Sequence, residues 1–502
     1  MMLYSRKKKA FFIGDGINLK DIRKKEARRV KVYVPEEFRV GHMGIFGTTR
    51  SGKTRLAESL AEHDIRRGKS VWIFDPKGDI KLLAKTVQTC CLTNRAEQFI
   101  FFSPVHLEVS AKLNPLAYWV MLEEVVHHIA SGVSGATTAG DAQFFYKVAQ
   151  EVLIVVARSL QVLDIVRGRE PEFNIVRLNH FISFTDLQKL YTQLRGIARS
   201  VGSKQIEGRP IKDIVEKELL PKIAQMLASG EEHFAKVSST LRTELSQFAI
   251  GTVSQLFGDV RVNPVFEKLI GNQPHVFYCM TGSLLTRDTA HIIARMILSG
   301  LHSIAGQFNA EGKQFNPPLS VIVDEGSNVL YHGMDDLYNK AGGTNIQLTI
   351  LTQSLADFET TLGKAYTQKI MDNLNIQIFM RVNHIGTAKY ASDKSGKLRV
   401  FSPILSMGGF SSAREMEKVV LPENALMELK DREFIAFIYE NAYVGRTATV
   451  SPYHLTITMP QLKRKSTPSG KIPSAYYNEA VSYTHLRAHE TSLHLVCRLL
   501  LE

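Results

Sequence analysis

The sequence predicts an α/β fold, a mostly parallel β-sheet into which an all-α domain is inserted. Short apolar segments recur along the chain and are typical of strands buried on both faces. Helical segments separate many of them, as parallel strands require. Ligands of such a sheet bind at the carboxyl ends of its strands. The expected strands are residues 43–46, 71–74, 99–102, 275–280, 320–323, 347–352, 376–382 and 434–439.

The strand pattern stops between residues 116 and 263, where apolar residues follow helical spacing. Phe144, Val148 and Val152 begin one such stripe, and residues 234–257 repeat the pattern. We expect this stretch to be an inserted helical domain. The expected division of the chain is a lead at 1–40, an α/β core at 41–115 and 264–455, the all-α insert at 116–263, and a linker with a tail at 456–502.

The two ends of the chain differ from the rest in composition. The start carries the basic run from Arg6 to Lys9 but lacks the apolar core of a secretory signal, and we interpret it as a stretch that follows a missing membrane anchor. Lys463 to Lys465, followed by Ser, Pro and Gly, indicate a linker. The residues from Ser482 onward resemble a fragment that recurs on unrelated sequences, and we interpret them as an artefact.

Length, charge and cysteine content limit which classes of protein the chain can belong to. The 502 residues suffice for two or three domains, and a formal net charge of +13 favours a polyanionic partner, either nucleic acid or an anionic membrane surface. The four cysteines lack metal-ligand spacing, which indicates a reducing compartment without structural zinc. Apolar runs stay well short of the roughly 18 residues that span a bilayer, so we expect no transmembrane segment.

An eight-residue segment from Gly47 to Thr54 fits the phosphate-binding pattern G-x-x-x-x-G-K-[ST] directly after an expected strand. Glycines let backbone N–H groups curl round a phosphate, Lys53 reaches the β- and γ-phosphates, and the Thr54 hydroxyl binds Mg²⁺. The motif predicts a P-loop NTPase of the RecA-like type, with ATP and Mg²⁺ as ligands. The expected nucleotide-binding residues are Gly47, Thr48, Thr49, Arg50, Ser51, Gly52, Lys53, Thr54 and Arg55.

Two further strand ends carry residues that such a site needs. Asp324 and Glu325 follow one apolar strand: Asp324 would hold Mg²⁺, and Glu325 would orient and deprotonate the attacking water. Gln353 ends the next strand and would sense the γ-phosphate or position water. An ordinary turn or cap is the alternative for each. With Lys53, we take Glu325 and Gln353 as the candidate catalytic residues.

A charged turn, Asp75-Pro-Lys77-Gly-Asp79, follows the strand at 71–74. Asp-Pro and Lys-Gly are ordinary turn formers, so geometry alone is a sufficient explanation. Its expected place beside the phosphate loop suggests a functional role for Asp75 and Lys77 as well.

Together these motifs resemble the TraD and TraG type of conjugative coupling protein, most closely the TraD subfamily of integrating conjugative elements, within the FtsK and HerA class of DNA motors. The resemblance covers about residues 40 to 455. It is carried by Gly47 to Thr54, Asp75 to Asp79, Val323 to Glu325, Asn339-Lys340 with Gln347 to Asp357, Asn373 to Asn375, and Arg381-Val382.

The resemblance implies an ATP-driven homo-hexamer at the cytoplasmic face of the bacterial inner membrane. Such a protein receives single-stranded DNA bound to a relaxase and passes it to the proteins of a type IV secretion channel. Two departures stand out. The family's N-terminal transmembrane helices are missing, so either the chain is truncated or another protein supplies its membrane anchor. Gly342 stands where an arginine is expected that acts on the neighbouring subunit's nucleotide. Lys340 or Arg381 would then substitute, or the motor is slow. Otherwise Arg381 is a plain surface residue.

Other functions remain open on the sequence alone. Within the enzyme class, the chain fits a DNA translocase of the FtsK or HerA kind, or a secretion ATPase that moves only protein. Outside it, the chain fits a nucleotide-gated docking scaffold with little hydrolysis. Turnover measured with and without DNA distinguishes these.

Overall fold

The computed structural model describes residues 10–22, 27–134, 141–257, 260–282, 285, 288–331, 333–405 and 411–462. The basic run before residue 10 and the expected tail lie outside this part of the chain. Within it, the search for membrane spans found no helix with the length and apolarity that crossing a bilayer requires.

An eleven-stranded sheet forms the centre of the molecule, in the order β2-β1-β15-β14-β11-β3-β10-β9-β4-β8-β5. The seven strands from β11 to β5 are parallel, and the other four are antiparallel. The strands are β1 (Ala10–Asn18), β2 (Val30–Pro35), β3 (Met43–Phe46), β4 (Ser70–Asp75), β5 (Phe99–Phe102), β8 (Val276–Met280), β9 (Leu319–Val323), β10 (Ile346–Thr352), β11 (Ile376–Phe379), β14 (Glu433–Ile438) and β15 (Asn441–Thr447). All eight predicted strands are present, although β11 ends three residues earlier than expected.

Alternate residues of the parallel strands enter two different hydrophobic cores. In β4, Val71 and Ile73 pack with α2 (Lys53–Arg66) and α3 (Ile80–Leu92) on one face of the sheet. Trp72 and Phe74 point to the opposite face, which α14 (Asp288–Ala310) covers. The strands therefore read as continuous apolar runs because both of their faces are buried.

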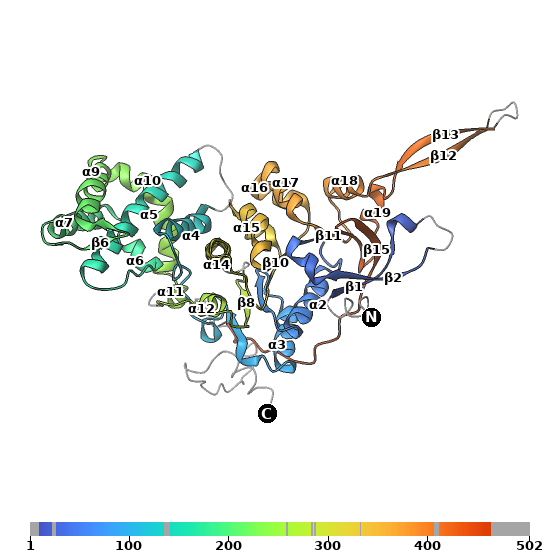
Figure 1. The fold of residues 1–502 in the computed structure, drawn as a ribbon, viewed down its shortest axis with the longest axis horizontal. Coiled ribbons are helices and arrows are strands. Elements are labelled where there is room, and N and C mark those ends of the chain that lie inside the picture. The colour runs from blue at the N-terminus through green and yellow to red at the C-terminus, as the bar shows by residue number, and fades with distance from the viewer. Residues whose placement is uncertain are drawn as a thin grey trace, which may run out of the picture.

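A helical lobe occupies one end of the molecule (Figure 1). Its helix α4 lies against α14, and Gly132 permits the close approach because a Cβ there would come 2.7 Å from Met296 Cγ. The core of the lobe is continuous with the core on that face of the sheet. The helices of the lobe are α4 (Leu122–Ser134), α5 (Asp141–Val166), α6 (Ile175–His180), α7 (Phe184–Ala198), α8 (Ile211–Asp213), a π-helix at Ile214–Leu219, α9 (Leu220–Ala228), α10 (Glu231–Ala249) and α11 (Ser254–Phe257), with the short strands β6 (Gln205–Ile206) and β7 (Arg209–Pro210).

The remaining helices connect the strands of the sheet. They are α12 (Pro264–Ile270), α15 (Met334–Lys340), α16 (Leu355–Leu362), α17 (Lys364–Asn373), α18 (Ile385–Lys394) and α19 (Glu423–Met427), with short 3-10 helices η1 (Leu19–Asp21), η2 (Glu36–Gly41), η3 (Ala96–Gln98), η4 (Leu107–Val109), η6 (Gly326–Asn328) and η7 (Ala341–Thr344).

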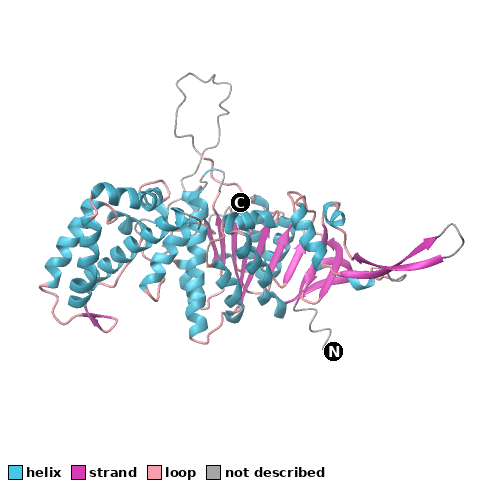
Figure 2. Ribbon diagram, turned by 90° about the horizontal axis from the view of Figure 1, so that it is seen from above, coloured by secondary structure: helices cyan, strands magenta, loops and turns pink. Residues whose placement is uncertain are grey.

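The sequence did not predict β1, β2, β15, the short pair β6 and β7, or the pair β12 (Lys397–Leu405) and β13 (Ser411–Val419). Strands β1 and β2 lie within the segment expected to be a lead, where Gly14 and Gly16 break the apolar pattern of β1. The glycines have a steric reason, since a Cβ at Gly14 would meet the Arg446 carbonyl oxygen of β15 at 2.1 Å. Strands β12 and β13 pair into a ribbon that projects from the body at the end opposite the helical lobe (Figure 2).

A buried ion cluster joins several elements at the amino-terminal edge of the parallel strands. Asp64, near the end of α2, accepts hydrogen bonds from Lys69 at 2.8 Å, from Ser320 of β9 at 2.7 Å, and from Arg39 of η2. Lys69 also donates to Gln347 of β10 at 2.7 Å. One carboxylate thus ties α2, η2 and two neighbouring strands together.

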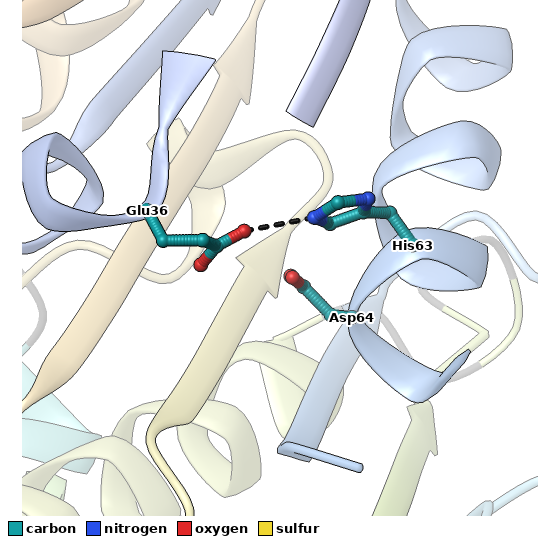
Figure 3. A group of neighbouring side chains, drawn as sticks. All are labelled: Glu36, His63 and Asp64. Carbon is teal, nitrogen blue, oxygen red and sulfur yellow. Dashed lines mark hydrogen bonds and ion pairs between the residues drawn. The ribbon is translucent and has the colours of Figure 1, made fainter. Parts of the chain in front are cut away.

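The same cluster places Glu36, His63 and Asp64 close enough to suggest a metal site (Figure 3). Glu36 accepts from His63 at 2.8 Å and also pairs with Lys69. Burial alone would raise the pKa of Asp64, but the charges of Arg39 and Lys69 hold it well below its usual range. Because two cations already neutralise these carboxylates, the cluster is an ion-pair network and does not suit a metal ion.

Replacing Asp64 should destabilise the fold strongly. Asp64→Asn removes the more buried of the two counter-charges of Arg39 and Lys69 and leaves them only Glu36, at an expected cost of about 3–5 kcal/mol. Asp213→Asn is the matched control, because Asp213 makes an exposed ion pair with Lys217 at 3.1 Å and should change stability by less than about 1 kcal/mol. Urea unfolding of the two variants measures both effects, and equal midpoints would contradict the assigned role of Asp64.

Candidate nucleotide-binding site

The carboxyl ends of four adjacent parallel strands bring the predicted motifs to one edge of the sheet. The Asp324 N–H donates to the Phe74 carbonyl at 2.9 Å, which places the end of β9 beside that of β4. The Gly47 N–H donates to the Thr352 carbonyl at 3.2 Å, which joins the phosphate loop to the end of β10. Segments roughly 250 to 300 residues apart in sequence therefore meet at this edge.

The loop from β3 to α2 has the geometry of a phosphate-binding turn. Arg50 and Gly52 adopt positive φ angles of 64° and 113°. A Cβ at Gly47 would lie 2.7 Å from Ser51 Oγ, so the turn closes only over a glycine. Ser51 donates to the Thr48 carbonyl at 2.8 Å and holds the turn shut. The loop ends at the amino terminus of α2, where free N–H groups and the helix dipole favour an anion.

Lys53 begins α2 and bends back over this loop. Its ammonium donates to the carbonyl of Gly47 and, at 3.1 Å, to that of Thr48. Burial lowers the pKa of Lys53 to about 8, although the nearby charge of Asp324 opposes the shift. The side chain is thus held where a phosphate would lie along the loop.

Asp324 offers a carboxylate oxygen suited to a cation. The side chain is 1% exposed, and Oδ1 accepts from the Glu325 N–H at 3.0 Å. Oδ2 is buried without a hydrogen-bond partner among the described residues. Burial raises the pKa of Asp324, while the Lys77 charge opposes it. An unpaired buried oxygen near the helix start that carries Thr54 fits Mg²⁺, which prefers oxygen ligands.

Glu325 and Lys77, from different motifs, meet at this edge. Glu325 has a left-handed backbone, with φ at 47° and ψ at 51°. Its Oε1 lies 2.5 Å from the Lys77 ammonium. Burial would lower the pKa of Lys77, but the bond to Glu325 and the charge of Asp324 raise it. The charged turn after β4 therefore belongs to the same site as the acids after β9.

Asp75 holds that turn in place. Its buried carboxylate accepts from the N–H groups of Lys77 at 3.1 Å, Gly78 at 2.9 Å and Asp79 at 2.6 Å. The Tyr278 hydroxyl of β8 donates to it at 2.7 Å. Burial raises the pKa of Asp75 to about 6. Asp75 thus orients the turn that presents Lys77, and both its oxygens are already engaged.

Two predicted residues lie at the rim of the loop. Gln353 is exposed and directly follows Thr352, whose carbonyl accepts from the Gly47 N–H. The Arg381 carbonyl accepts from the Thr48 N–H at 2.7 Å, and its guanidinium lies 3.6 Å from the Asp431 carboxylate. The side chains of both remain partly free to reach a ligand.

Lys340 lies at the opposite edge of the sheet. It ends α15, before the amino end of β10, and forms an exposed pair with Asp336 at 3.2 Å. The length of β10, roughly 20 Å at about 3.3 Å per residue, separates it from the phosphate loop of its own chain. Lys340 therefore lies far from the nucleotide site of its own chain, and its role toward a neighbouring subunit stays a prediction.

Gly342 also lies at that opposite edge, in η7. A Cβ there would come 2.7 Å from the Val40 carbonyl oxygen, so η7 and η2 approach too closely for a side chain. An arginine at this position would need a rearranged backbone.

Two contacts at the site were not predicted. Tyr278, which bonds Asp75, lies in a wholly apolar strand and carries no motif. Arg432 lies in a turn, and its N–H donates to the Ser51 carbonyl at 3.0 Å. A Ser354-x-x-Asp357 capping box was readable in the sequence, and its Asp357 also accepts from Thr352 at 3.1 Å beside the loop.

Comparisons with known families agree with this arrangement. A family model described as the TraM recognition site of TraD and TraG matches residues 318–431, which include Asp324, Glu325, Gln353 and Arg381. Residues 318–431 are therefore similar to this TraD/TraG-type domain. The central domain of the helicase HerA matches residues 21–222, which include the phosphate loop. The resemblance predicted from the motifs is thereby confirmed.

Solved structures give the same fold. The unbound conjugative coupling protein TrwBdeltaN70 superposes with a TM-score of 0.62 at 16% identity, over 89% of this chain and 95% of that one. TrwB in complex with the ATP analogue ADPNP superposes with a TM-score of 0.63 at 15% sequence identity, over 89% of this chain and 98% of that one. TrwB in complex with ADP and Mg²⁺ superposes with a TM-score of 0.59 at 16% sequence identity, over 91% of this chain and 97% of that one. The predicted fold is confirmed. A search of curated proteins returned no match.

The close approach at Gly342 predicts that side chains there destabilise the protein. Gly342→Ala should cost about 1–3 kcal/mol through overpacking, and Gly342→Arg should cost no less. Gly306→Ala is the control: a Cβ there meets no described atom within 4 Å, and its place within α14 predicts a gain of about 0.5–1 kcal/mol. Thermal unfolding of the variants measures these changes in stability. An unchanged melting temperature for Gly342→Arg would show that the position accepts an arginine.

Proposed function

We propose that this chain is an ATP-hydrolysing coupling protein that delivers or pumps single-stranded DNA, with its relaxase, into a type IV secretion channel during conjugative transfer. The observation that carries the proposal is the meeting of Lys53, Asp324 and Glu325 at one sheet edge within a chain that is similar to a TraD/TraG-type domain over residues 318–431. The TrwB complexes with ADPNP and with ADP and Mg²⁺ support ATP and Mg²⁺ as the ligands.

Each residue has a defined part in hydrolysis. The phosphates lie along the loop against the amino terminus of α2, and Lys53 exchanges its bonds with the loop carbonyls for phosphate oxygens. Thr54 and Asp324 would hold Mg²⁺, which would supply positive charge to neutralise the phosphates. Glu325 orients a water molecule and accepts its proton as the water oxygen bonds to the γ-phosphorus and the bond to the bridging oxygen breaks. Gln353 senses the γ-phosphate at the rim.

The finer parts of the proposal concern partners. A net charge of +13 and the HerA-type domain support binding to the DNA phosphate backbone, which would be salt-dependent and largely independent of sequence. The domain named for TraM recognition supports a partner in the complex that prepares DNA for transfer. We place the protein as a homo-hexamer at the cytoplasmic face of the inner membrane, beside the secretion channel.

One observation favours a second function, a nucleotide-gated docking scaffold with little hydrolysis. Position 342, where the resemblance places an arginine that acts on the neighbouring subunit's nucleotide, is a glycine without room for a side chain. An arginine in such a role contributes a rate factor of about 10³–10⁵, so a site without one would bind ATP and turn it over slowly.

The lowered pKa of Lys53 predicts a pH dependence of nucleotide binding. Lys53 is cationic below its pKa of about 8 and loses its charge above it. Because an anionic triphosphate binds the cationic form, affinity should be nearly constant from pH 6.5 to 7.5 and fall by up to about tenfold per unit above pH 8. Calorimetric titration with a non-hydrolysable ATP analogue measures this. Lys53→Ala should bind weakly with no such fall, and equal wild-type affinity at pH 7 and pH 9 would exclude this role.

Hydrolysis by the full chain tests the proposed function. We expect ATP turnover that single-stranded DNA stimulates and that falls by about 10²-fold or more in Lys53→Ala and in Glu325→Gln. Asp213→Asn, on the helical lobe, should hydrolyse at the wild-type rate. ATP binding without turnover, with or without DNA, would reject the motor in favour of the scaffold, and turnover indifferent to DNA would favour a secretion ATPase that moves only protein.

A further inference from the structure

The ion pair between Lys77 and Glu325 places a cation on the residue assigned as general base. The ammonium and the carboxylate are 2.5 Å apart, and their side chains are 42% and 19% exposed. Neither the assembly of the phosphate loop nor the binding of Mg²⁺ requires this contact. It brings together the two turns that follow β4 and β9.

Backbone geometry fixes both partners. Glu325 leaves β9 in a left-handed conformation, which few non-glycine residues adopt and which sets the direction of its side chain. Lys77 sits on a turn whose N–H groups are gathered by Asp75. The pair therefore follows from the placement of two rigid turns.

The contact opposes the task of a general base. A water molecule that attacks phosphorus must donate a hydrogen bond to the base, and Lys77 already occupies Glu325 Oε1. While the pair is closed, Glu325 is held at the turn after β4.

We propose that Lys77 is a positioning residue that restrains Glu325 and keeps ATP turnover low until single-stranded DNA engages the protein. This rests on the proposed function, since Glu325 must be the base for its restraint to affect the rate. Opening the pair then releases the carboxylate to orient water.

Contiguous contacts connect this pair to the helical lobe. The Tyr278 hydroxyl of β8 donates to Asp75 at 2.7 Å, and the Thr281 N–H just after β8 donates to the Asp75 carbonyl at 3.2 Å. Phe277 and Cys279 of β8 share one hydrophobic core with α14, which packs against α4 of the lobe. A shift of the lobe and α14 has a direct route to the turn that carries Lys77.

The test compares steady-state ATP hydrolysis by the full chain for wild type, Lys77→Met, Lys77→Arg and Lys81→Met. Lys77→Met should raise the DNA-free kcat roughly fivefold, the rate equivalent of about 1 kcal/mol for a partly exposed ion pair. KM for ATP should stay within about twofold, since the variant keeps the phosphate loop intact, and DNA should stimulate it less. Lys77→Arg should restore the low DNA-free rate. Lys81, exposed four residues on, is the matched control and should leave kcat unchanged.

A lower or unchanged DNA-free kcat in Lys77→Met overturns the restraint while wild-type hydrolysis leaves the proposed function standing. If wild type does not hydrolyse ATP, the proposed function fails on its own. Turnover that appears only in Lys77→Met would then still support the restraint, and its absence there would overturn it.

The chemical reactivity of the lysine side chains tests the Lys77–Glu325 ion pair without measuring ATP hydrolysis. Acetic anhydride should modify Lys77 more slowly than Lys81 in the wild type, and Glu325→Gln should speed the modification of Lys77 alone. Equal rates in the wild type overturn the inference. Unchanged melting temperatures show that the Lys77 variants are folded.

Discussion

The parallel pairing of β4, β9, β10 and β3 is the constraint on which the rest of the structure depends. Parallel strands end at a common edge, so four short segments from distant parts of the sequence deliver their next residues to one place. The bonds from Asp324 to Phe74 and from Gly47 to Thr352 fix that convergence at the level of single peptides. Backbone hydrogen bonds between the strands thus bring the phosphate loop, the buried acid and the charged turn to the same edge.

The two edges of the sheet differ in whether a buried carboxylate is fully paired with cations. At the amino edge, the Asp64 carboxylate is matched by Arg39 and Lys69, which suits an edge that holds elements together. At the carboxyl edge, Asp324 keeps an oxygen without a described partner, and the desolvation of that acid is compensated only in part. An incompletely matched buried charge is costly in the folded protein, and its place beside the phosphate loop gives it a functional reason.

Much of the fold and of the nucleotide site could be predicted, because strands buried on both faces and the loop from Gly47 to Thr54 leave patterns in consecutive residues. The rest depends on relations that a linear pattern does not contain. Gly14 lies in β1 because β15 passes too close for a side chain, and in the sequence it reads as a strand breaker. Sequence alone did not show that Lys340 lies at the far edge from the loop. Nor could it show that Lys77 meets Glu325, since that contact depends on how two separate turns face each other.

The contact of α4 with α14 at Gly132 determines whether the helical lobe can be separated from the sheet as an independent domain. The helical lobe shares one uninterrupted apolar interior with the sheet, so it is not a module attached by a tether. Excising it would bare the face of α14 to water, and the excised piece would lose one wall of its own interior. The lobe and the sheet should therefore unfold together as one cooperative unit. If evolution replaced the lobe by another, the residues of α14 that contact the lobe would have to change as well.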